Sequence, residues 1–104
     1  MIYIKLHEAD DGAILAMCDE ALINKIVEAD GVYINVKDYS EFYKGELVDK
    51  KAAAKIINEN EIYSANIVGN ESVELAITKN IIKRENVMSA NGIDYANAYR
   101  ILYK

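Results

Sequence analysis

Two hairpin signals, one near each end of the chain, limit the folds open to this sequence. Asp11-Gly12 and Asn91-Gly92 are dipeptides of the kind that form type I′ turns, in which both central residues need a positive φ. Before the first signal, residues 2–7 alternate between apolar and polar side chains, as in a half-buried strand. The return strand is expected over residues 13–18, so the chain starts with an antiparallel pair of strands.

Between the two hairpins, three helical patterns alternate with two strand patterns. The helical patterns have apolar residues at i, i+3 and i+4 spacing, and each follows a capping residue or a glycine. We expect helices after Asp19, Asp49 and Gly69, and strands over residues 32–36 and 62–68. The polar and aromatic segment over residues 37–47 is expected to be a structured loop.

Antiparallel hairpins with helices between them predict an α+β fold. We expect a two-layer sandwich, in which about three helices pack on one face of a mixed or antiparallel sheet. A length of 104 residues gives room for a single α+β domain over residues 1–104 and for no second core. After Tyr95 the sequence fits a strand and a helix equally well.

Cysteine usage and charge exclude several classes of function. Cys18 is the only cysteine, which excludes an internal disulfide and a cysteine-based zinc site and favours a reducing compartment such as the cytoplasm. The 12 basic residues are scattered and outnumbered by 17 acidic ones, whereas nucleic-acid binding relies on clustered positive charge. Nucleic acid is therefore a disfavoured partner. Apolar runs fall far short of the roughly 20 residues of a membrane helix, and we expect no membrane insertion, metal or cofactor.

One hypothesis is a small enzyme that uses Cys18 as an activated thiol. If Asp11 and Gly12 form the first turn, Lys5 lies opposite Cys18 and His7 is its diagonal neighbour. Cys18 also precedes a predicted helix, whose dipole would favour a thiolate. The alternative is that Cys18 is a small buried hydrophobic residue and that His7 is structural or solvent-exposed. We favour this alternative and expect a protein that is not an enzyme.

The segment around Tyr43 and Gly45 is a first candidate for binding. Aromatic residues beside a glycine in a loop can form a recognition surface on a rigid scaffold. The same residues can equally anchor the loop to the core, and both interpretations stay open.

A second candidate runs from Asn66 through Gly69 to Glu71, with Asp19 as a further candidate residue. A strand, a glycine and a helix start can direct free N–H groups toward an anion. A single glycine is not a phosphate-binding loop, however, and Glu71 already complements the helix dipole. Helix capping by Asn70 is the favoured interpretation.

The order of these local patterns is characteristic. The segments concerned are Tyr3-Ile4-Lys5, His7-Glu8, Cys18-Asp19-Glu20, residues 42–47 and residues 65–71. Together they resemble an archaeal family known as domain of unknown function 424, over nearly the whole chain. The resemblance implies a compact α+β fold in an archaeal cytoplasm, with no established activity, cofactor or substrate.

The chain departs from that family's pattern at two places. Ile23-Asn24 stands where the family has a glycine after the leucine of the first helix. Ile93-Asp94-Tyr95 stands where the family has a Pro-His pair after a glycine. The missing histidine argues further against a histidine-dependent enzyme.

We therefore expect a non-catalytic binding or interaction domain, attached to core archaeal machinery such as translation. The partner we expect is another protein or a second copy of the chain. The alternatives are the enzyme with Cys18 as its thiol and a structural homodimer formed through an exposed sheet edge or the tyrosine-rich C-terminal segment. A structure distinguishes them in part, by showing whether Cys18, Tyr43 and Asn66 line one cleft.

Overall fold

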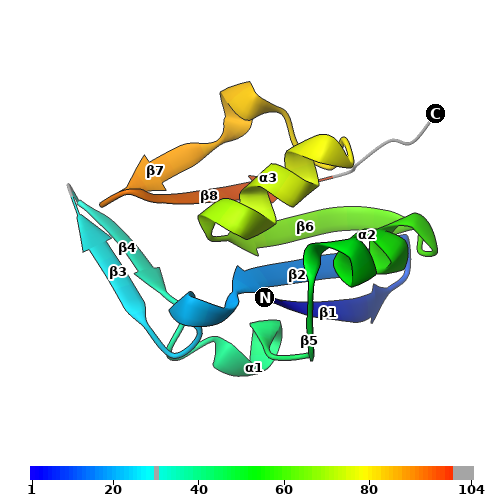
Figure 1. Ribbon diagram of the computed structural model, residues 1–104, viewed down its shortest axis with the longest axis horizontal. Helices are drawn as coiled ribbons and strands as arrows, with labels where there is room; N and C mark the ends of the chain where they lie inside the picture. The colour runs from blue at the N-terminus through cyan, green and yellow to red at the C-terminus, as the bar shows by residue number, and fades with distance from the viewer. Residues whose placement is uncertain (30, 100–104) are drawn as a thin grey trace.

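The structure is a computed structural model that describes residues 1–29 and 31–99. Its main sheet has the strand order β5-β1-β2-β6-β8-β7, and β3 and β4 form a separate two-stranded ribbon (Figure 1). The strands of the main sheet are β1 (Ile2–Ala9), β2 (Gly12–Asp19), β5 (Glu46–Val48), β6 (Ile62–Val68), β7 (Met88–Ala90) and β8 (Ile93–Ala98). The ribbon consists of β3 (Ile26–Ala29) and β4 (Val32–Asn35), and the helices are α1 (Ser40–Tyr43), α2 (Lys50–Asn58) and α3 (Asn70–Thr78). Short 3-10 turns lie at Glu20–Leu22 and Arg84–Asn86.

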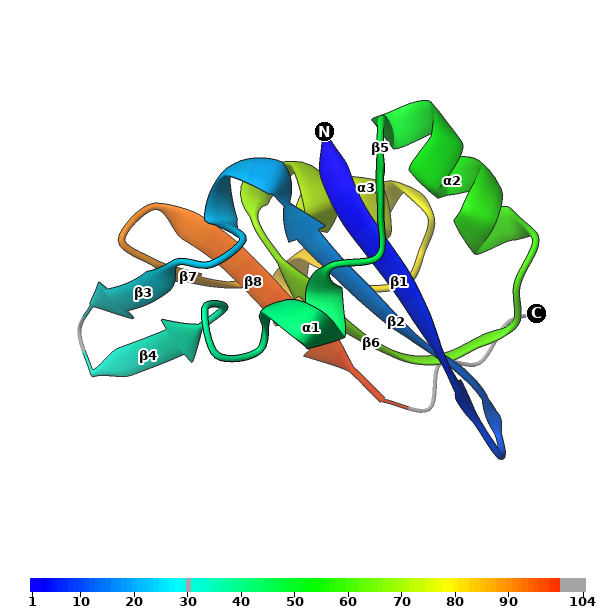
Figure 2. The same cartoon turned by 90° about the horizontal axis from the view of Figure 1, so that it is seen from below.

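The sheet is mixed, because β2 and β6 run parallel while its other neighbouring strands are antiparallel. α2 and α3 cover one face of the sheet, whereas α1 and the β3–β4 ribbon lie on the other side (Figures 1 and 2). The predicted α+β fold with a mixed sheet is confirmed. The layering differs in one respect, since α1 does not share a face with the two longer helices.

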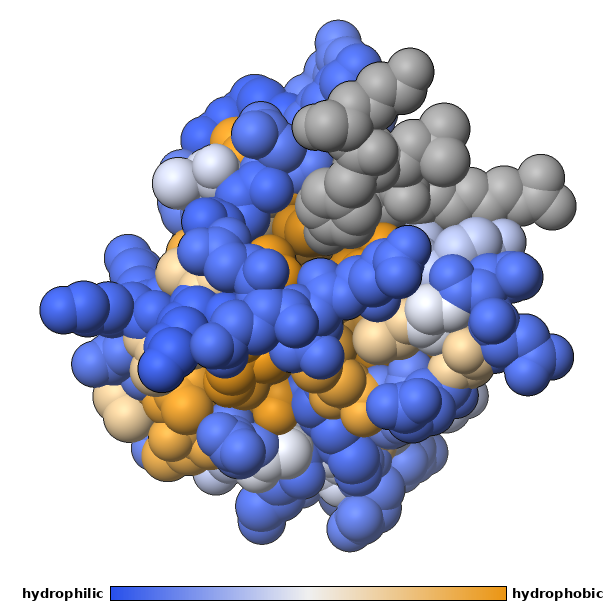
Figure 3. Space-filling view, turned by 90° about the vertical axis from the view of Figure 1, so that its right-hand side faces the viewer, coloured by the Kyte–Doolittle hydropathy of each residue, from blue (hydrophilic) through white to orange (hydrophobic). Residues whose placement is uncertain are grey.

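Each face of the sheet has its own hydrophobic core, because successive strand residues point to opposite sides. The larger core lies beneath α2 and α3 and includes the strand residues Ile2, Ile4, Leu15, Met17, Ala65 and Ile67. The smaller core, on the other face, includes Cys18, Val36 and Val68. Partly buried residues such as Leu6 and Ile56 extend the larger core outward. Hydrophobic surface shows between polar side chains at the end of the molecule drawn in Figure 3.

The first hairpin turns at Asp10-Asp11, one residue earlier than predicted. Gly12 belongs to β2, where it pairs with Ala9 of β1. It also lies against the start of β6, where an added Cβ would be 3.3 Å from the Glu61 carbonyl oxygen. The register moves by two residues, so Lys5 lies opposite Ala16, and its predicted pairing with Cys18 is wrong. Because the shift is even, every side chain stays on its predicted face.

The predicted first helix after Asp19 is also wrong. The chain makes one 3-10 turn, passes through Asn24 with a φ of 66°, and enters β3. Within β3, Ile26 is 45% exposed and Val27 is 7% exposed. Burial thus alternates with a period of two, and pairing with β4 decides between strand and helix for a short apolar run that fits both.

Most of the remaining predicted elements are confirmed. Asp49 caps α2, since its Oδ1 accepts a hydrogen bond from the Ala52 N–H at 2.8 Å. α3 ends before Asn80, which has the predicted left-handed backbone with a φ of 60°. The second hairpin turns at Asn91-Gly92, where both φ values are positive, at 52° and 78°. The predicted structured loop after β4 contains α1 and β5.

Two predicted features fall at the limits of the described residues. The segment after Tyr95 continues as β8 to Ala98, and residues 100–104 lie outside the described part. Asp30, at the boundary between the predicted first helix and the next strand, also lies outside it. Within the described residues, no helix is long and apolar enough to cross a membrane.

Candidate functional site

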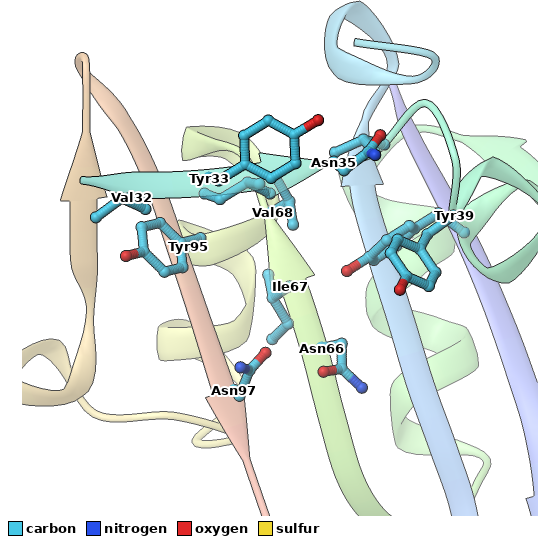
Figure 4. Close-up of a pocket in the computed structure, with 12 residues that line it drawn as sticks. Val32, Tyr33, Asn35, Tyr39, Asn66, Ile67, Val68, Tyr95 and Asn97 are labelled. Carbon is cyan, nitrogen blue, oxygen red and sulfur yellow. The ribbon is translucent and has the colours of Figure 1, made fainter. Parts of the chain in front are cut away.

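A pocket with a volume of about 390 Å³ lies between the β3–β4 ribbon and the face of the sheet that α2 and α3 leave open (Figure 4). Four tyrosines and three asparagines line it, namely Tyr33, Tyr39, Tyr43, Tyr95, Asn35, Asn66 and Asn97. Its other lining residues are aliphatic, namely Val32, Ile34, Val36, Ile67 and Val68. The described residues thus give the pocket aromatic rings, hydroxyls and amides, and no charged side chain.

Two asparagines within strands form the floor of the pocket, which is the side made by the main sheet. Asn66 in β6 lies directly opposite Asn97 in β8, and the neighbouring pair on the same face is Val68 with Tyr95. Figure 4 shows the two side chains on neighbouring strands of the sheet. Asparagine is depleted in strands, where β-branched and aromatic side chains pack better. Two of them side by side on the open face of a sheet therefore indicate a use for their amides.

The amides on the floor make no hydrogen bond to other described residues. Among those residues, the asparagine side chains that donate hydrogen bonds are Asn35, Asn60 and Asn70. Asn66 and Asn97 are not among them, so their N–H and C=O groups face the pocket and the solvent.

The wall of the pocket is held in place by a turn after β4. The Asn35 side chain donates to the Asp38 carboxylate at 2.8 Å and accepts a hydrogen bond from the Asp38 N–H at 2.9 Å. This reciprocal pair fixes the backbone that leads to Tyr39. The wall is therefore formed before any ligand arrives.

Tyr43 connects the pocket to the smaller core. Its ring packs against Cys18, Val36 and Val68, and Phe42 contacts it edge-on at a centroid distance of 5.2 Å. Burial, together with a smaller effect of the nearby Cys18, raises the pKa of Tyr43 to about 12. The phenol therefore keeps its proton, and can donate it in a hydrogen bond, throughout the neutral pH range.

Lys5 and His7, two of the predicted catalytic residues, hold α1 against the sheet. The His7 ring stacks on Phe42 at 4.4 Å with an interplanar angle of 10°, and its Nε2 lies 2.8 Å from the Phe42 carbonyl oxygen. A carbonyl oxygen only accepts hydrogen bonds, so Nε2 must carry the proton. Lys5 donates from Nζ to the Glu41 carbonyl oxygen at 2.7 Å. Both side chains are thus engaged with the backbone of one segment.

The structure does not assemble the predicted thiol site. Cys18 is 0% exposed, and its neighbour across β1 is Tyr3. Burial, together with a smaller effect of the Asp19 carboxylate, raises the pKa of Cys18 from 9.0 to about 12. These surroundings do not favour the thiolate that the enzyme hypothesis requires, because Lys5 lies opposite Ala16 and only a single 3-10 turn follows Asp19. Cys18 occupies the place of a small hydrophobic residue.

The segment from β6 through Gly69 to α3 does bind an anion, and the anion is the protein's own Asp19. Asp19 Oδ1 accepts hydrogen bonds from the N–H and Oγ of Ser72 at 2.8 and 2.7 Å, and Oδ2 accepts one from the N–H of Glu71 at 3.1 Å. Gly69 has a φ of 112°, and a Cβ at this position would overlap the Asp19 carboxylate. Asp19, Gly69 and Glu71 therefore form a helix cap, in place of the predicted binding site.

Two other predicted residues also serve the fold. Asn70, the expected cap of α3, joins that helix to the second hairpin, because its Oδ1 accepts a hydrogen bond from the Asp94 N–H at 2.7 Å. At Gly45, a Cβ would overlap the Ile4 carbonyl oxygen, so the glycine lets the chain approach β1 closely. Of the predicted binding residues, the pocket brings together Tyr43 and Asn66.

Sequence reasoning missed most of the pocket. The residues missed are Tyr33, Asn35, Tyr39, Tyr95 and Asn97. The available signal was an asparagine inside a strand pattern, at Asn66 and again at Asn97. Cys18 lies beneath Tyr43 in the smaller core without lining the pocket, so the three segments around Cys18, Tyr43 and Asn66 meet without forming one cleft.

The other hollows and side-chain clusters offer fewer free groups that could bind a ligand. A hollow of about 580 Å³ at the C-terminal ends of α2 and α3 is lined by the turns that end these helices, and Asn60 there uses its Nδ2 to bond the Ile56 carbonyl oxygen at 2.7 Å. The described residues hold no group of three or more His, Cys, Asp or Glu side chains that could bind a metal ion. The tyrosine- and asparagine-lined pocket is therefore the candidate site.

Comparison with solved structures finds an uncharacterized conserved protein from Methanopyrus kandleri, with a TM-score of 0.79 and 20% sequence identity. The match covers 99% of this chain and 94% of that chain. At this identity the likeness shows a shared fold. No curated protein matches the sequence. The family model described as protein of unknown function (DUF424) matches residues 7–101, which confirms the resemblance seen in the sequence, and the chain belongs to this family.

Proposed function

We propose that this chain is a non-catalytic binding domain and that the pocket between the β3–β4 ribbon and the sheet is its binding site. The observation that carries the proposal is the convergence of four tyrosines and three asparagines on one uncharged pocket. Tyrosine supplies a large contact area at a low entropic cost, and asparagine supplies adaptable hydrogen bonds. This combination is typical of protein surfaces that recognise a partner.

Preorganisation of the pocket supports the same proposal. Asn35 and Asp38 fix one wall, and Tyr43 is anchored on the smaller core. A site whose side chains are already ordered loses less entropy when it binds its ligand. Tyr33 and Tyr39, at 59% and 65% exposed, leave ring faces open to a partner.

The setting that we propose is the archaeal cytoplasm, with attachment to core machinery such as translation. The structural neighbour comes from an archaeon. The single cysteine, buried and without a second thiol to pair with, suits a reducing compartment. The partner we propose is a protein.

The test is partner capture from native lysate at several salt concentrations, with pocket variants beside the wild type. The pocket variants are Asn66→Ala and Tyr39→Ala. Matched controls are Asn58→Ala and Tyr99→Ala, at exposed positions outside the pocket. We expect the wild type and both controls to retain one partner stoichiometrically, and the pocket variants to lose it.

Two results would contradict this proposal. One is a wild type that retains no stoichiometric partner at any salt concentration. The other is a partner that the two pocket variants retain as well as the wild type does. Circular dichroism and urea unfolding of each variant ensure that lost binding does not reflect lost folding.

A homodimer is the second candidate, and exposed hydrophobic residues near the sheet edge favour it. Met88 on the edge strand β7 is 50% exposed, and Ile26 on the nearby β3 is 45% exposed. An exposed edge strand can pair with another copy. Light scattering at high protein concentration tests this candidate, and the molar mass of a monomer would eliminate it.

A further inference from the structure

The aromatic rings of the pocket stand apart from one another. Among the described residues, the close aromatic pairs are His7 with Phe42 and Phe42 with Tyr43, and no two pocket tyrosines form such a pair. In Figure 4, the rings of Tyr33, Tyr39 and Tyr95 occupy different sides of the pocket. Separate ring faces leave gaps between them, and such gaps accept apolar rings of a ligand.

The polar groups of the pocket suit a ligand that presents carbonyl oxygens. The side-chain amides of Asn66 and Asn97 offer N–H donors on the floor. Tyr43 adds an O–H donor that stays protonated, since burial raises its pKa to about 12. Amide carbonyl groups of a peptide backbone are the most abundant uncharged acceptors that a protein partner can offer.

Charge argues against a nucleic-acid strand in this pocket. Each nucleotide brings a phosphate, which Lys and Arg side chains must neutralise. The pocket lining contains neither residue type, and the chain carries a net charge of −5. The carboxylate of Asp38, which is bonded to the lining residue Asn35, would repel a phosphate.

We propose that the pocket binds a proline-rich segment of a partner protein in the polyproline II conformation, an inference that rests on the binding function proposed above. Such a segment makes no internal hydrogen bonds, so its backbone carbonyl groups are free to accept them from the asparagine and tyrosine donors. Proline contributes apolar rings and no N–H, and therefore requires only donors from the pocket. The segment is extended before it binds, which lowers the entropic cost.

The occupant comes from another protein. The chain contains no proline, so neither its own termini nor a second copy can supply the segment. This separates the inference from the homodimer, in which the same chain would be the partner.

The experiment is a titration of the isotopically labelled full chain, followed by ¹H–¹⁵N correlation spectra. The probe is decaproline with both ends capped to remove their charges. A capped glycine–serine peptide of the same length, an oligouridine and a neutral disaccharide serve as comparison ligands. We expect decaproline to move the signals of Asn66, Tyr95 and Asn97, with an affinity that does not change between low and high salt.

Variants sharpen the test. Asn66→Ala and Tyr39→Ala are each expected to weaken decaproline binding by about ten-fold, the loss typical of a residue central to an interface. Tyr99→Ala and Asn58→Ala, outside the pocket, are expected to leave the affinity within about two-fold of the wild type.

Failure of this inference differs from failure of the proposed function. If decaproline leaves the pocket signals unchanged, moves signals elsewhere only, or binds the pocket variants as tightly as the wild type, the proline-rich ligand is wrong. If the oligouridine or the disaccharide then moves the pocket signals, the site binds a different class of ligand and the binding function stands. If the glycine–serine peptide binds as tightly as decaproline, the pocket recognises only the peptide backbone, and the inference of a proline-rich ligand is overturned.

Discussion

Replacement of Asp19 by alanine is expected to destabilise the protein far more than replacement of an exposed helix cap. Asp19 ends β2, yet its carboxylate closes the first turn of α3, more than fifty residues later in the sequence. It accepts three hydrogen bonds there, two of them from Ser72, which is 0% exposed. The substitution removes all three acceptors at once.

The size of the effect follows from where those donors lie. The Ser72 N–H and Oγ–H would lose their acceptor at a fully buried residue beside the partly buried Asp19, at about 1–3 kcal/mol for each buried donor. The Glu71 N–H lies at a more exposed helix end, where water replaces the lost bond at little cost. Loss of the negative charge facing the helix dipole adds about 0.3–1 kcal/mol. We expect Asp19→Ala to lower the free energy of unfolding by about 3–5 kcal/mol, a large part of a typical stability of about 5–15 kcal/mol.

Urea unfolding at 25 °C, followed by circular dichroism, measures this loss. The matched control is Asp49→Ala, which removes one hydrogen bond from the exposed first turn of α2 and is expected to cost about 1 kcal/mol. Asp19→Asn retains one carbonyl oxygen for Ser72 and is expected to fall between the two. The reasoning is refuted if Asp19→Ala costs no more than Asp49→Ala. A double-mutant cycle with Ser72→Ala then tests the pair directly, and we expect a coupling of about 1–2 kcal/mol.

Further predictions concern two glycines, the buried thiol and alkaline pH. Gly69→Ala combines a φ of 112° with overlap of the Asp19 carboxylate, and we expect a loss of about 3 kcal/mol or more in urea unfolding. Gly45→Ala would place its Cβ against a backbone carbonyl oxygen of β1 and is expected to cost about 2–3 kcal/mol in the same assay; a loss below about 0.5 kcal/mol would contradict the close approach. Cys18 is expected to resist iodoacetamide in the folded protein from pH 5 to 9 and to react fully in urea, whereas rapid alkylation near pH 7 would support the thiol enzyme. The folded-state pKa of Cys18 is raised from 9.0 to about 12, and that of Tyr43 from 10.0 to about 12. Both groups therefore contribute fully to stability below pH 9. The contribution of Cys18 is lost between pH 9 and 12, and that of Tyr43 between pH 10 and 12. The slope approaches about 1.4 kcal/mol per pH unit for each group, and Cys18→Ala is expected to remove the part that begins near pH 9.

Sequence reasoning succeeded where the physics is local. The cap at Asp49, the left-handed residue at Asn80 and the turn at Asn91-Gly92 depend on contacts within a few residues, and all three are confirmed. The faces of β1 and β2 were also predicted, because alternation depends on parity and not on the exact register. Even the error in the first turn left each side chain on its predicted side of the sheet.

Sequence reasoning failed where a distant contact decides the outcome. Asp19 has the chemistry of a helix cap, and the sequence places a helix-like apolar pattern directly after it. The carboxylate instead caps α3. Part of that apolar pattern forms the strand β3, because it pairs with β4. Nothing near Asp19 in the sequence distinguishes these two uses of one side chain, because the competing partner is a strand-to-helix turn at Gly69 that becomes its neighbour only when β2 and β6 pair.

The same argument explains why the candidate site was seen only in fragments. Tyr43 and Asn66 were singled out as parts of two separate segments. Asn66 lies in the predicted strand that forms β6, and what makes it notable is Asn97 opposite it on β8. That pairing joins segments about thirty residues apart in the sequence. The strand β4, which lines the opposite side of the pocket, was predicted as a strand, but the sequence did not show where in the fold it would lie. A polar residue that interrupts a strand pattern costs stability unless its side chain is used. Two such interruptions that meet on one face of a sheet support the proposed binding site more strongly than any single motif in this chain.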